Sequence, residues 1–301
     1  MPTSYPTIVP YADNRYVSYN LTDQMSMLDD KLQVILGARY QDIDTKNLYK
    51  KTKYSSDKLS PSLGVVVKPF GEDLSFYASY VEGLSEGVTV SDITYPTATN
   101  KGETFAPYQT KQYELGTKYQ IGSWLNTLAL YQIEKPEVYQ DTISKAVKDD
   151  AETRSRGIEL STAGQLTEDL SLMANLAYID AEYVKSGTAS QVGNTVIGTP
   201  DFTAGLGMDY KIPVVDGLSV NARASYVSEQ YLNTDNSLEL PDYTILDLGA
   251  KYATKIGGVN TTFRANVNNL TDEKYWSGVF GNNYAILGAG RTYKLGVTFD
   301  F

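Results

Sequence analysis

The feature that most constrains this chain is a strict alternation of apolar and polar residues, repeated in segments of about 10 residues. In the clearest segment, Val259, Phe263 and Val267 face one way, whereas Asn260 and Arg264 face the other. A period of two is the side-chain period of a β-strand, because successive side chains point to opposite faces. The alternation therefore predicts an all-β chain whose strands have two differently solvated faces.

The same alternation predicts about thirteen strands. They are expected at residues 15–27, 31–46, 57–68, 73–83, 109–120, 123–137, 152–164, 169–184, 200–211, 217–231, 242–253, 258–270 and 289–301. Short and long connections alternate between them. The long connections are rich in polar residues and tyrosine, and lie at 47–56, 84–108, 138–151, 185–199, 232–241 and 271–288. A transmembrane antiparallel β-barrel has tight turns on one side and long loops on the other. A soluble β-sandwich, the alternative, gives no reason for such sorting.

Tyrosine placement supports the barrel. The chain has 25 Tyr against 8 Phe and 2 Trp. Amphipathic rings gather where a membrane meets water, and two aromatic girdles are predicted. One comprises Tyr119, Tyr210 and Tyr252, and the other Tyr40, Tyr80, Tyr131, Tyr178 and Tyr226. The opposite face would line a wet lumen, with residues such as Gly37, Arg39, Glu114, Lys118, Glu159, Arg223, Asp247, Lys251 and Arg264.

Composition excludes several functions. The chain has neither Cys nor His, which removes disulfides, thiolate metal sites, Ser-His-Asp triads and imidazole chemistry. An enzyme is not expected. A net charge of −10 argues against nucleic acid as a partner. No run of 18 apolar residues predicts a transmembrane helix. No cofactor or metal ligand is expected, since Asp149 and Asp150 fit a solvated acidic loop better than a calcium site.

The carboxyl terminus predicts an assembly signal. Tyr293, Leu295 and Val297 continue into Phe299 and Phe301 as one apolar row. The pattern resembles the C-terminal β-signal by which bacterial outer-membrane barrels are recognised for insertion. Its elements here are Lys294, Gly296, Phe299 and Phe301.

Segments along almost the whole chain resemble the barrel of TonB-dependent outer-membrane siderophore receptors, of the hydroxamate type that carries ferrichrome- or coprogen-like ligands. They are Leu32–Tyr40, Ser60–Pro69, Leu74–Gly83, Thr110–Tyr119, Arg154–Ser161, Asn266–Trp276 and residues 290–293. The most characteristic is the Asn-Asn-Leu-Thr-Asp-x-x-Tyr-Trp box that ends at Trp276.

The resemblance implies a 22-stranded barrel, of which residues 1–301 would form the C-terminal part as one domain. The family also has an N-terminal plug domain and a short box that engages TonB, and neither has a counterpart here. The first residues lack the features of a signal peptide, which suggests an engineered fragment, a mature fragment or a truncated gene. Residues 1–12 could supply a fourteenth strand, although Pro2, Pro6 and Pro10 argue against it.

The resemblance implies uptake of a ferric siderophore from the outer membrane of a Gram-negative cell. The implied partners are the siderophore, outer-membrane lipids and lipopolysaccharide, the barrel assembly machinery, and TonB through the missing N-terminal part. Energised uptake is not expected of this chain alone. The alternatives are a passive pore or non-transporting surface protein made from a truncated receptor, and a degraded or artificial fragment without activity.

Ligand contacts are expected from the long loops and the upper lumen wall. Aromatic rings would pack on the apolar backbone of the chelate, and two arginines would meet its negative charge, whereas iron would be held by the siderophore itself. The candidates are Tyr95, Tyr139, Arg154, Arg156, Tyr231, Tyr275, Trp276 and Tyr284.

Overall fold

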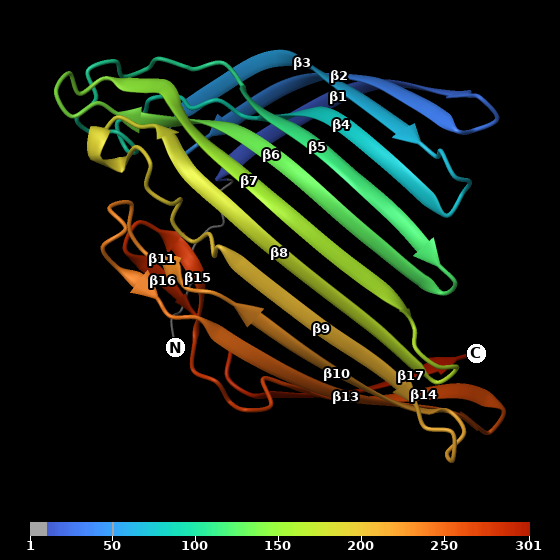
Figure 1. The fold of residues 1–301 in the computed structure, drawn as a ribbon. Coiled ribbons are helices and arrows are strands. Elements are labelled where there is room, and N and C mark those ends of the chain that lie inside the picture. The colour runs from blue at the N-terminus through green and yellow to red at the C-terminus, as the bar shows by residue number, and fades with distance from the viewer. Residues whose placement is uncertain (1–10, 50) are drawn as a thin grey trace.

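The computed structural model describes residues 11–49 and 51–301, so the prolines of the first ten residues lie outside it. One antiparallel sheet of thirteen strands follows chain order in the described part (Figure 1). Its strands are β1 (Ala12–Met27), β2 (Leu32–Asn47), β3 (Thr52–Val67), β4 (Leu74–Ser85), β5 (Tyr108–Ile121), β6 (Trp124–Gln140), β7 (Val147–Gln165), β8 (Leu170–Lys185), β9 (Phe202–Lys211), β10 (Leu218–Val227), β13 (Tyr243–Ile256), β14 (Val259–Asn268) and β17 (Thr292–Asp300). The predicted fold class and number of strands are confirmed.

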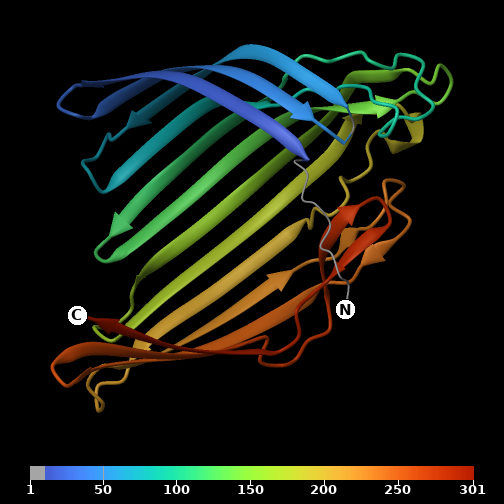
Figure 2. The same ribbon diagram turned by 180° about the vertical axis from the view of Figure 1, so that it is seen from behind.

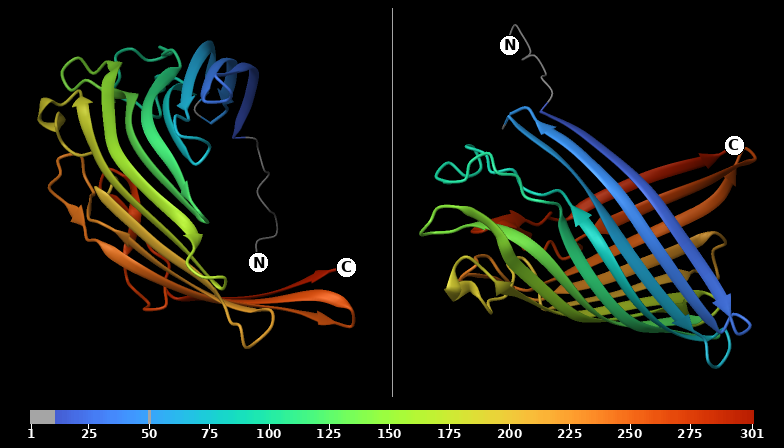
Figure 3. Two further views of the ribbon diagram at one scale, coloured as in Figure 1. Left: turned by 45° about the vertical axis from the view of Figure 1, so that its right-hand side comes forward. Right: turned by 90° about the horizontal axis from the view of Figure 1, so that it is seen from above.

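The sheet curls into an open trough with β1 at one edge and β17 at the other (Figures 2 and 3). The short connections lie together at one end of the trough, called the turn end, and the long connections lie at the opposite loop end. Because neighbouring strands are antiparallel and the sheet has thirteen of them, β1 and β17 both run from the loop end to the turn end.

Strand register confirms that the two faces differ. Leu115 lies opposite Leu130, and Ile158 lies opposite both Leu130 and Tyr178, so apolar residues share one face across β5 to β8. This face is the outer one, since lipid requires apolar contacts. The polar face, called the inner face, would line the lumen.

The aromatic girdles are confirmed with one exception. The other predicted tyrosines occupy the outer face, where the rings of Tyr80 and Tyr113 lie 5.1 Å apart. Tyr131 instead lies opposite Glu114 and Gly157, on the inner face. The prediction for Tyr131 was wrong because it considered only the distance of this residue from the turn. It did not consider which of the two alternating faces that position occupies.

Several strands extend past the predicted ends at the loop end. The expected loop at 47–56 is wrong, since only residues 48–51 separate β2 from β3, and the loop at 138–151 shrinks to 141–146. These extensions are mainly polar, which weakens the contrast that marks a membrane-spanning strand; their polar residues include Thr52, Lys53, Lys148, Asp149 and Asp150. The sheet therefore stands above the lipid at the loop end.

Smaller elements occupy the loop end. They are a 3-10 helix η1 (Ala189–Gln191) and two hairpins, β11–β12 (Gln230–Tyr231 and Glu239–Leu240) and β15–β16 (Trp276–Gly281 and Tyr284–Leu287). The predicted strand at 217–231 is thus divided into β10 and β11. No helix in the described ranges has the length and hydropathy to cross a membrane.

The terminal strand has the predicted form. Tyr293, Leu295 and Val297 lie opposite outer-face residues of β14, and the rings of Phe299 and Phe301 are stacked 6.4 Å apart. Gly296 has open space where a side chain would begin. The role of the terminal strand in assembly stays a prediction.

Candidate functional site

The long connections at the loop end form two groups held by hydrogen bonds. The first loop cluster consists of residues 86–107, between β4 and β5, and residues 141–147 at the tip of the β6–β7 hairpin. The second loop cluster consists of residues 186–201, 228–242 and 269–291, which include the two small hairpins. Both clusters are the structural candidates for a ligand-binding mouth.

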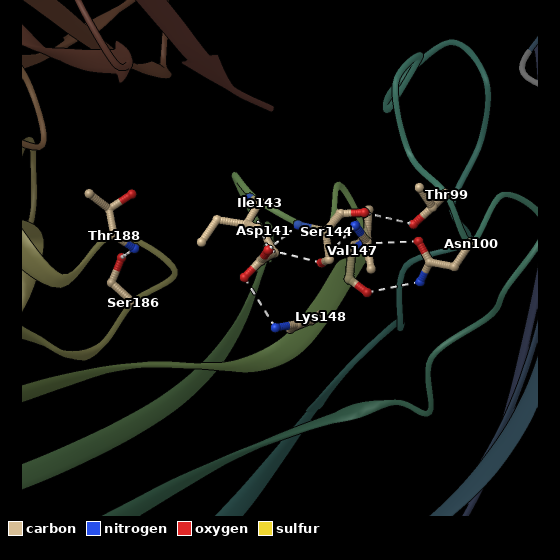
Figure 4. Close-up of polar contacts among 10 residues, drawn as sticks. Thr99, Asn100, Asp141, Ile143, Ser144, Val147, Lys148, Ser186 and Thr188 are labelled. Carbon is tan, nitrogen blue, oxygen red and sulfur yellow. Dashed lines mark hydrogen bonds and ion pairs between the residues drawn. The ribbon is translucent and has the colours of Figure 1, made fainter.

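The first loop cluster is joined by Asn100, which bonds both backbone groups of Val147 at 2.9 Å (Figure 4). The Thr99 hydroxyl adds a bond to the Ser144 carbonyl at 3.2 Å. Val147 is buried together with Val90 and Ala98 in a small apolar core. A long loop is therefore fastened to the hairpin tip by side-chain bonds and a core of its own.

A carboxylate fixes the hairpin tip. Asp141 accepts bonds from the Ser144 backbone N–H at 2.7 Å, from the Ser144 hydroxyl at 2.9 Å and from Lys148 at 3.1 Å. These donors, with the backbone N–H first, hold the pKa of Asp141 well below its ordinary value. A lowered pKa contributes stability above the unfolded value, near 4, and loses it as pH falls through the folded value. The ionised carboxylate of Asp141 therefore favours this conformation of the tip at neutral pH.

The first loop cluster folds over the inner face. The Thr45 hydroxyl bonds the Glu86 carboxylate, and the Val88 N–H donates to the Tyr108 hydroxyl at 3.3 Å. Beneath them Ile43 and Tyr54 are almost fully buried, at 1% and 2% exposure. The loop thus narrows the opening above β2 to β5.

The second loop cluster is joined by asparagines. Asn236 accepts the Thr195 N–H at 2.7 Å and donates to the Thr195 carbonyl at 3.0 Å. Asn194 donates to the Thr234 carbonyl at 2.8 Å, and Asn282 accepts the Thr234 N–H at 3.1 Å. Three connections far apart in the sequence are therefore bonded into one unit.

The β15–β16 hairpin presents aromatic rings to solvent. Trp276 is 41% exposed and Tyr284 is 69% exposed, and Phe280 at the tip is more exposed still. Tyr275, just before the hairpin, is committed to packing, since its ring lies 4.4 Å from that of Tyr243. Phe280 was not among the predicted residues, although its position in a tyrosine-rich loop could have identified it as a candidate ligand contact.

The second loop cluster contacts the loop end of β6 at Tyr139, next to the first loop cluster. A Cβ on Gly187 would lie 1.8 Å from the Tyr139 ring, so only glycine allows this close approach. Tyr95 is half-buried against the apolar core of the first loop cluster, and burial raises its pKa. Tyr231 pairs with Glu239 in the β11–β12 hairpin of the second loop cluster. The structure therefore distributes the predicted tyrosines over both clusters.

The two predicted arginines do not lie on the lumen wall. Arg154 and Arg156 share the outer face of β7 with Ile158, because all three positions have the same parity. Arg154 forms an ion pair with Glu182, and Arg156 Nε donates to the Gln132 side chain at 2.7 Å. Counting by two from the apolar residues of β7 would have shown this from the sequence.

The middle of the inner wall carries a polar hollow of about 360 Å³ that the sequence did not single out. The Tyr77 hydroxyl donates to Glu114 at 2.6 Å, and Lys118 Nζ lies 5.7 Å from the centre of the Tyr77 ring. The hydroxyl end of the Tyr77 ring lies over Gly116, as that of Tyr131 lies over Gly157. Large inner-face side chains thus rest on glycines of the next strand.

Known proteins resemble this chain over most of its length. The family described as TonB dependent receptor-like, beta-barrel matches residues 2–270. The ferrichrome receptor FcuA of Yersinia enterocolitica is 32% identical, over 94% of this chain and 38% of that protein. The ferrioxamine B receptor of Salmonella typhimurium is 28% identical, over 95% of this chain and 41% of that protein.

Solved structures agree with the fold. BauA, the ferric preacinetobactin receptor from Acinetobacter baumannii, superposes with a TM-score of 0.84 at 35% identity, over 96% of this chain and 43% of that one. The chain spans about two-fifths of the length of these relatives. Such barrels lie in the outer membrane of Gram-negative bacteria, as the apolar outer face and its girdles require. The chain belongs to the TonB-dependent receptor β-barrel family.

Proposed function

We propose that this chain forms the barrel wall and extracellular mouth of a receptor that takes up a ferric siderophore across the outer membrane. The observation that carries the proposal is the pair of bonded loop clusters, with exposed rings, at the loop end of a barrel of this family. Relatives named as receptors for ferrichrome and ferrioxamine support the ligand class. TonB would act through parts of such receptors that this chain does not match.

The ligand would contact the loop end through aromatic side chains. Trp276 and Tyr284 are the strongest candidates, because they are exposed on a hairpin that the second loop cluster holds. Rings supply large contact area with few rotatable bonds, which suits the apolar backbone of a chelate. Tyr139 and Tyr231 are further contacts in the proposal, whereas Tyr95 and Tyr275 would shape the mouth through packing.

Negative charge on the ligand would not be met by Arg154 or Arg156, since both face outward. Protein ligands to iron are not required, because the siderophore fills the coordination sphere in this family. Binding would therefore depend mainly on ring contacts and on hydrogen bonds from the polar loops.

The test uses cells that lack their own ferrichrome and ferrioxamine receptors and that express the protein carrying this chain. Uptake of iron-55 loaded into each siderophore is measured with and without a protonophore. Uptake that the protonophore abolishes is expected. Uptake of iron that the protonophore does not change, or leakage of small solutes that it does not change, would favour the passive-pore alternative.

A paired variant tests the mouth. Replacing Trp276 and Tyr284 by alanine should weaken siderophore binding by about tenfold or more, because exposed aromatic anchors dominate such contacts. Phe70→Ala is the matched control, since Phe70 is 80% exposed but lies at the turn end. Equal binding by the double variant and the control would contradict the assignment of the β15–β16 hairpin.

A further inference from the structure

One carboxylate interrupts the outer face between the two aromatic girdles. The other outer-face positions there, on all thirteen strands of the described sheet, are apolar or neutral, and the exception is Asp23 of β1. Asp23 lies opposite Leu36 of β2, and Leu36 lies opposite Leu63 of β3, so the three share one face. Leu63 in turn lies opposite Tyr80, an outer-face ring. Asp23 therefore faces the lipid.

The depth of Asp23 is that of the bilayer midplane. Its partner Leu36 lies four residues from Leu32, at the turn end of β2, and four residues from Tyr40. Tyr40 belongs to the girdle nearer the loop end, called the upper girdle, and the other girdle is the lower one. Four residues span about 13 Å of strand, or about 10 Å of depth at a tilt of about 40°. An apolar band about 25 Å tall therefore extends past Asp23 on both sides.

No hydrogen bond or ion pair to Asp23 is present within residues 11–49 and 51–301. Arg15 shares its row but lies eight residues away, which is about 26 Å of strand. Arg39 of β2 points to the inner face, where its guanidinium bonds the Ser18 hydroxyl at 2.9 Å. Lys31 lies in the short turn that follows β1. The described strands thus leave the charge of Asp23 without a counter-charge.

An isolated carboxylate at this depth is costly, since hydrocarbon offers it neither water nor hydrogen-bond donors. Lysine and arginine can carry their charge to the membrane surface on long apolar stems, but aspartate has a single methylene and cannot. Charged groups inside a membrane usually pair with one another. Asp23 therefore requires a donor close to its own position.

The free edge of β1 is the open side of Asp23. β2 occupies one side of β1, and β1 ends the described sheet on the other. The chain spans about two-fifths of the length of its relatives, whose barrels continue past this edge. A residue directly opposite Asp23 on the next strand would have its Cβ about 5 Å away, and a diagonal neighbour would lie about 7–8 Å away. Both distances are within reach of a long cationic side chain.

We propose that Asp23 forms an ion pair inside the membrane with a lysine or arginine on the strand that joins the free edge of β1 in the complete receptor. Opposite charges directly across two antiparallel strands stabilise their pairing. The pair would also fix the register of this seam. A slip by one residue turns the cation to the lumen and leaves Asp23 alone in lipid.

Replacing Asp23 by leucine distinguishes a paired from an unpaired carboxylate by the sign of the effect. Beside a cationic partner, Asp23→Leu leaves that cation alone in lipid, and the folding equilibrium constant should fall about tenfold or more. Without a partner, the same change removes a charge from lipid and the constant should rise. Urea unfolding of the complete receptor in phospholipid vesicles measures the constant. A rise or an unchanged constant would overturn the proposal.

Asp42→Leu is the matched control, because Asp42 lies on the outer face of β2 but two residues above Tyr40, outside the apolar band. Its folding equilibrium constant should stay within about threefold of that of the unaltered receptor.

A charge exchange tests the pair where Asp23→Leu does not fold. Asp23→Lys should lower the amount of receptor in the outer membrane, since like charges would then face each other. Adding aspartate in place of the opposite basic residue should restore most of that amount. Failure to restore it, or no basic residue opposite Asp23 or two residues to either side, would refute the pairing.

Cysteine cross-linking identifies what lies against Asp23. This chain has no cysteine, so Asp23→Cys introduces a single thiol into it. Together with a cysteine at the opposite basic residue, it should form a disulfide within one receptor molecule. A disulfide-linked dimer from Asp23→Cys alone, or a link to a different protein, would place the contact elsewhere and overturn the proposal.

Discussion

Placing an arginine at Ala222 tests the division of the sheet into a lipid face and a wet face. Ala222 lies midway along β10 between Leu218, which lies opposite Tyr252 of the lower girdle, and Tyr226 of the upper girdle. Each half is about 13 Å of strand at 3.3 Å per residue, so Ala222 lies near the bilayer midplane. Its outer-face neighbours are Met208 and Leu248.

An arginine at that depth should lower the free energy of unfolding by about 2–4 kcal/mol. This corresponds to a loss of roughly 30- to 700-fold in the folding equilibrium. The adjacent residue, Asn221, has the same depth but lies on the inner face opposite Asp209. Asn221→Arg should cost less than about 1 kcal/mol, since the new charge meets water and a carboxylate.

The assay is urea unfolding of the protein in phospholipid vesicles, followed by tryptophan fluorescence for both variants and the unaltered protein. Steady-state amounts in the outer membrane give a second measurement. A larger loss at Asn221 would show that the faces have been assigned the wrong way, and equal losses would show that the two faces do not differ in their contact with lipid.

Three further changes test other features. Deleting Phe301 should lower the amount of receptor in the outer membrane without changing uptake per molecule, and unaltered amounts would contradict an assembly role. Gly157→Val should destabilise the barrel by about 1–3 kcal/mol because a Cβ there would lie 2.5 Å from the Tyr131 ring. Adding Tyr131→Ala to Gly157→Val should recover most of that loss, as measured by thermal unfolding in a double-mutant cycle. Asn100→Ala should speed hydrogen exchange at the Val147 amide by roughly fivefold to hundredfold, with amides of the second loop cluster unchanged, since two buried bonds are lost.

Much of the barrel could be predicted from sequence because lipid and water impose opposite demands on alternate residues. Where that contrast persists, as in β10 and β14, the predicted faces are confirmed. Where both faces meet water, as above the girdle on β2, β3, β6 and β7, the period carries no contrast and the strand ends were misplaced.

The wrong predictions for three side chains have a simpler cause. Tyr131, Arg154 and Arg156 were assigned by residue type and height along the strand, although parity with Leu130 and Ile158 fixes their faces. The loop clusters could not be predicted in this way. The bond between Asn100 and Val147 joins residues 47 apart, and only the folded sheet brings them together.

The shared direction of β1 and β17 restricts how the trough can close. If these two edges were joined directly, the seam would be a ladder of parallel strands within a sheet whose other pairs in the described residues are antiparallel. A seam that is antiparallel on both sides needs an odd number of inserted strands, with the first and last running upward toward the loop end. Barrels of 22 strands leave nine beyond the thirteen present here, and nine satisfies that parity rule. An insertion of eight or ten strands would force one mismatched seam, with its backbone groups poorly paired in lipid.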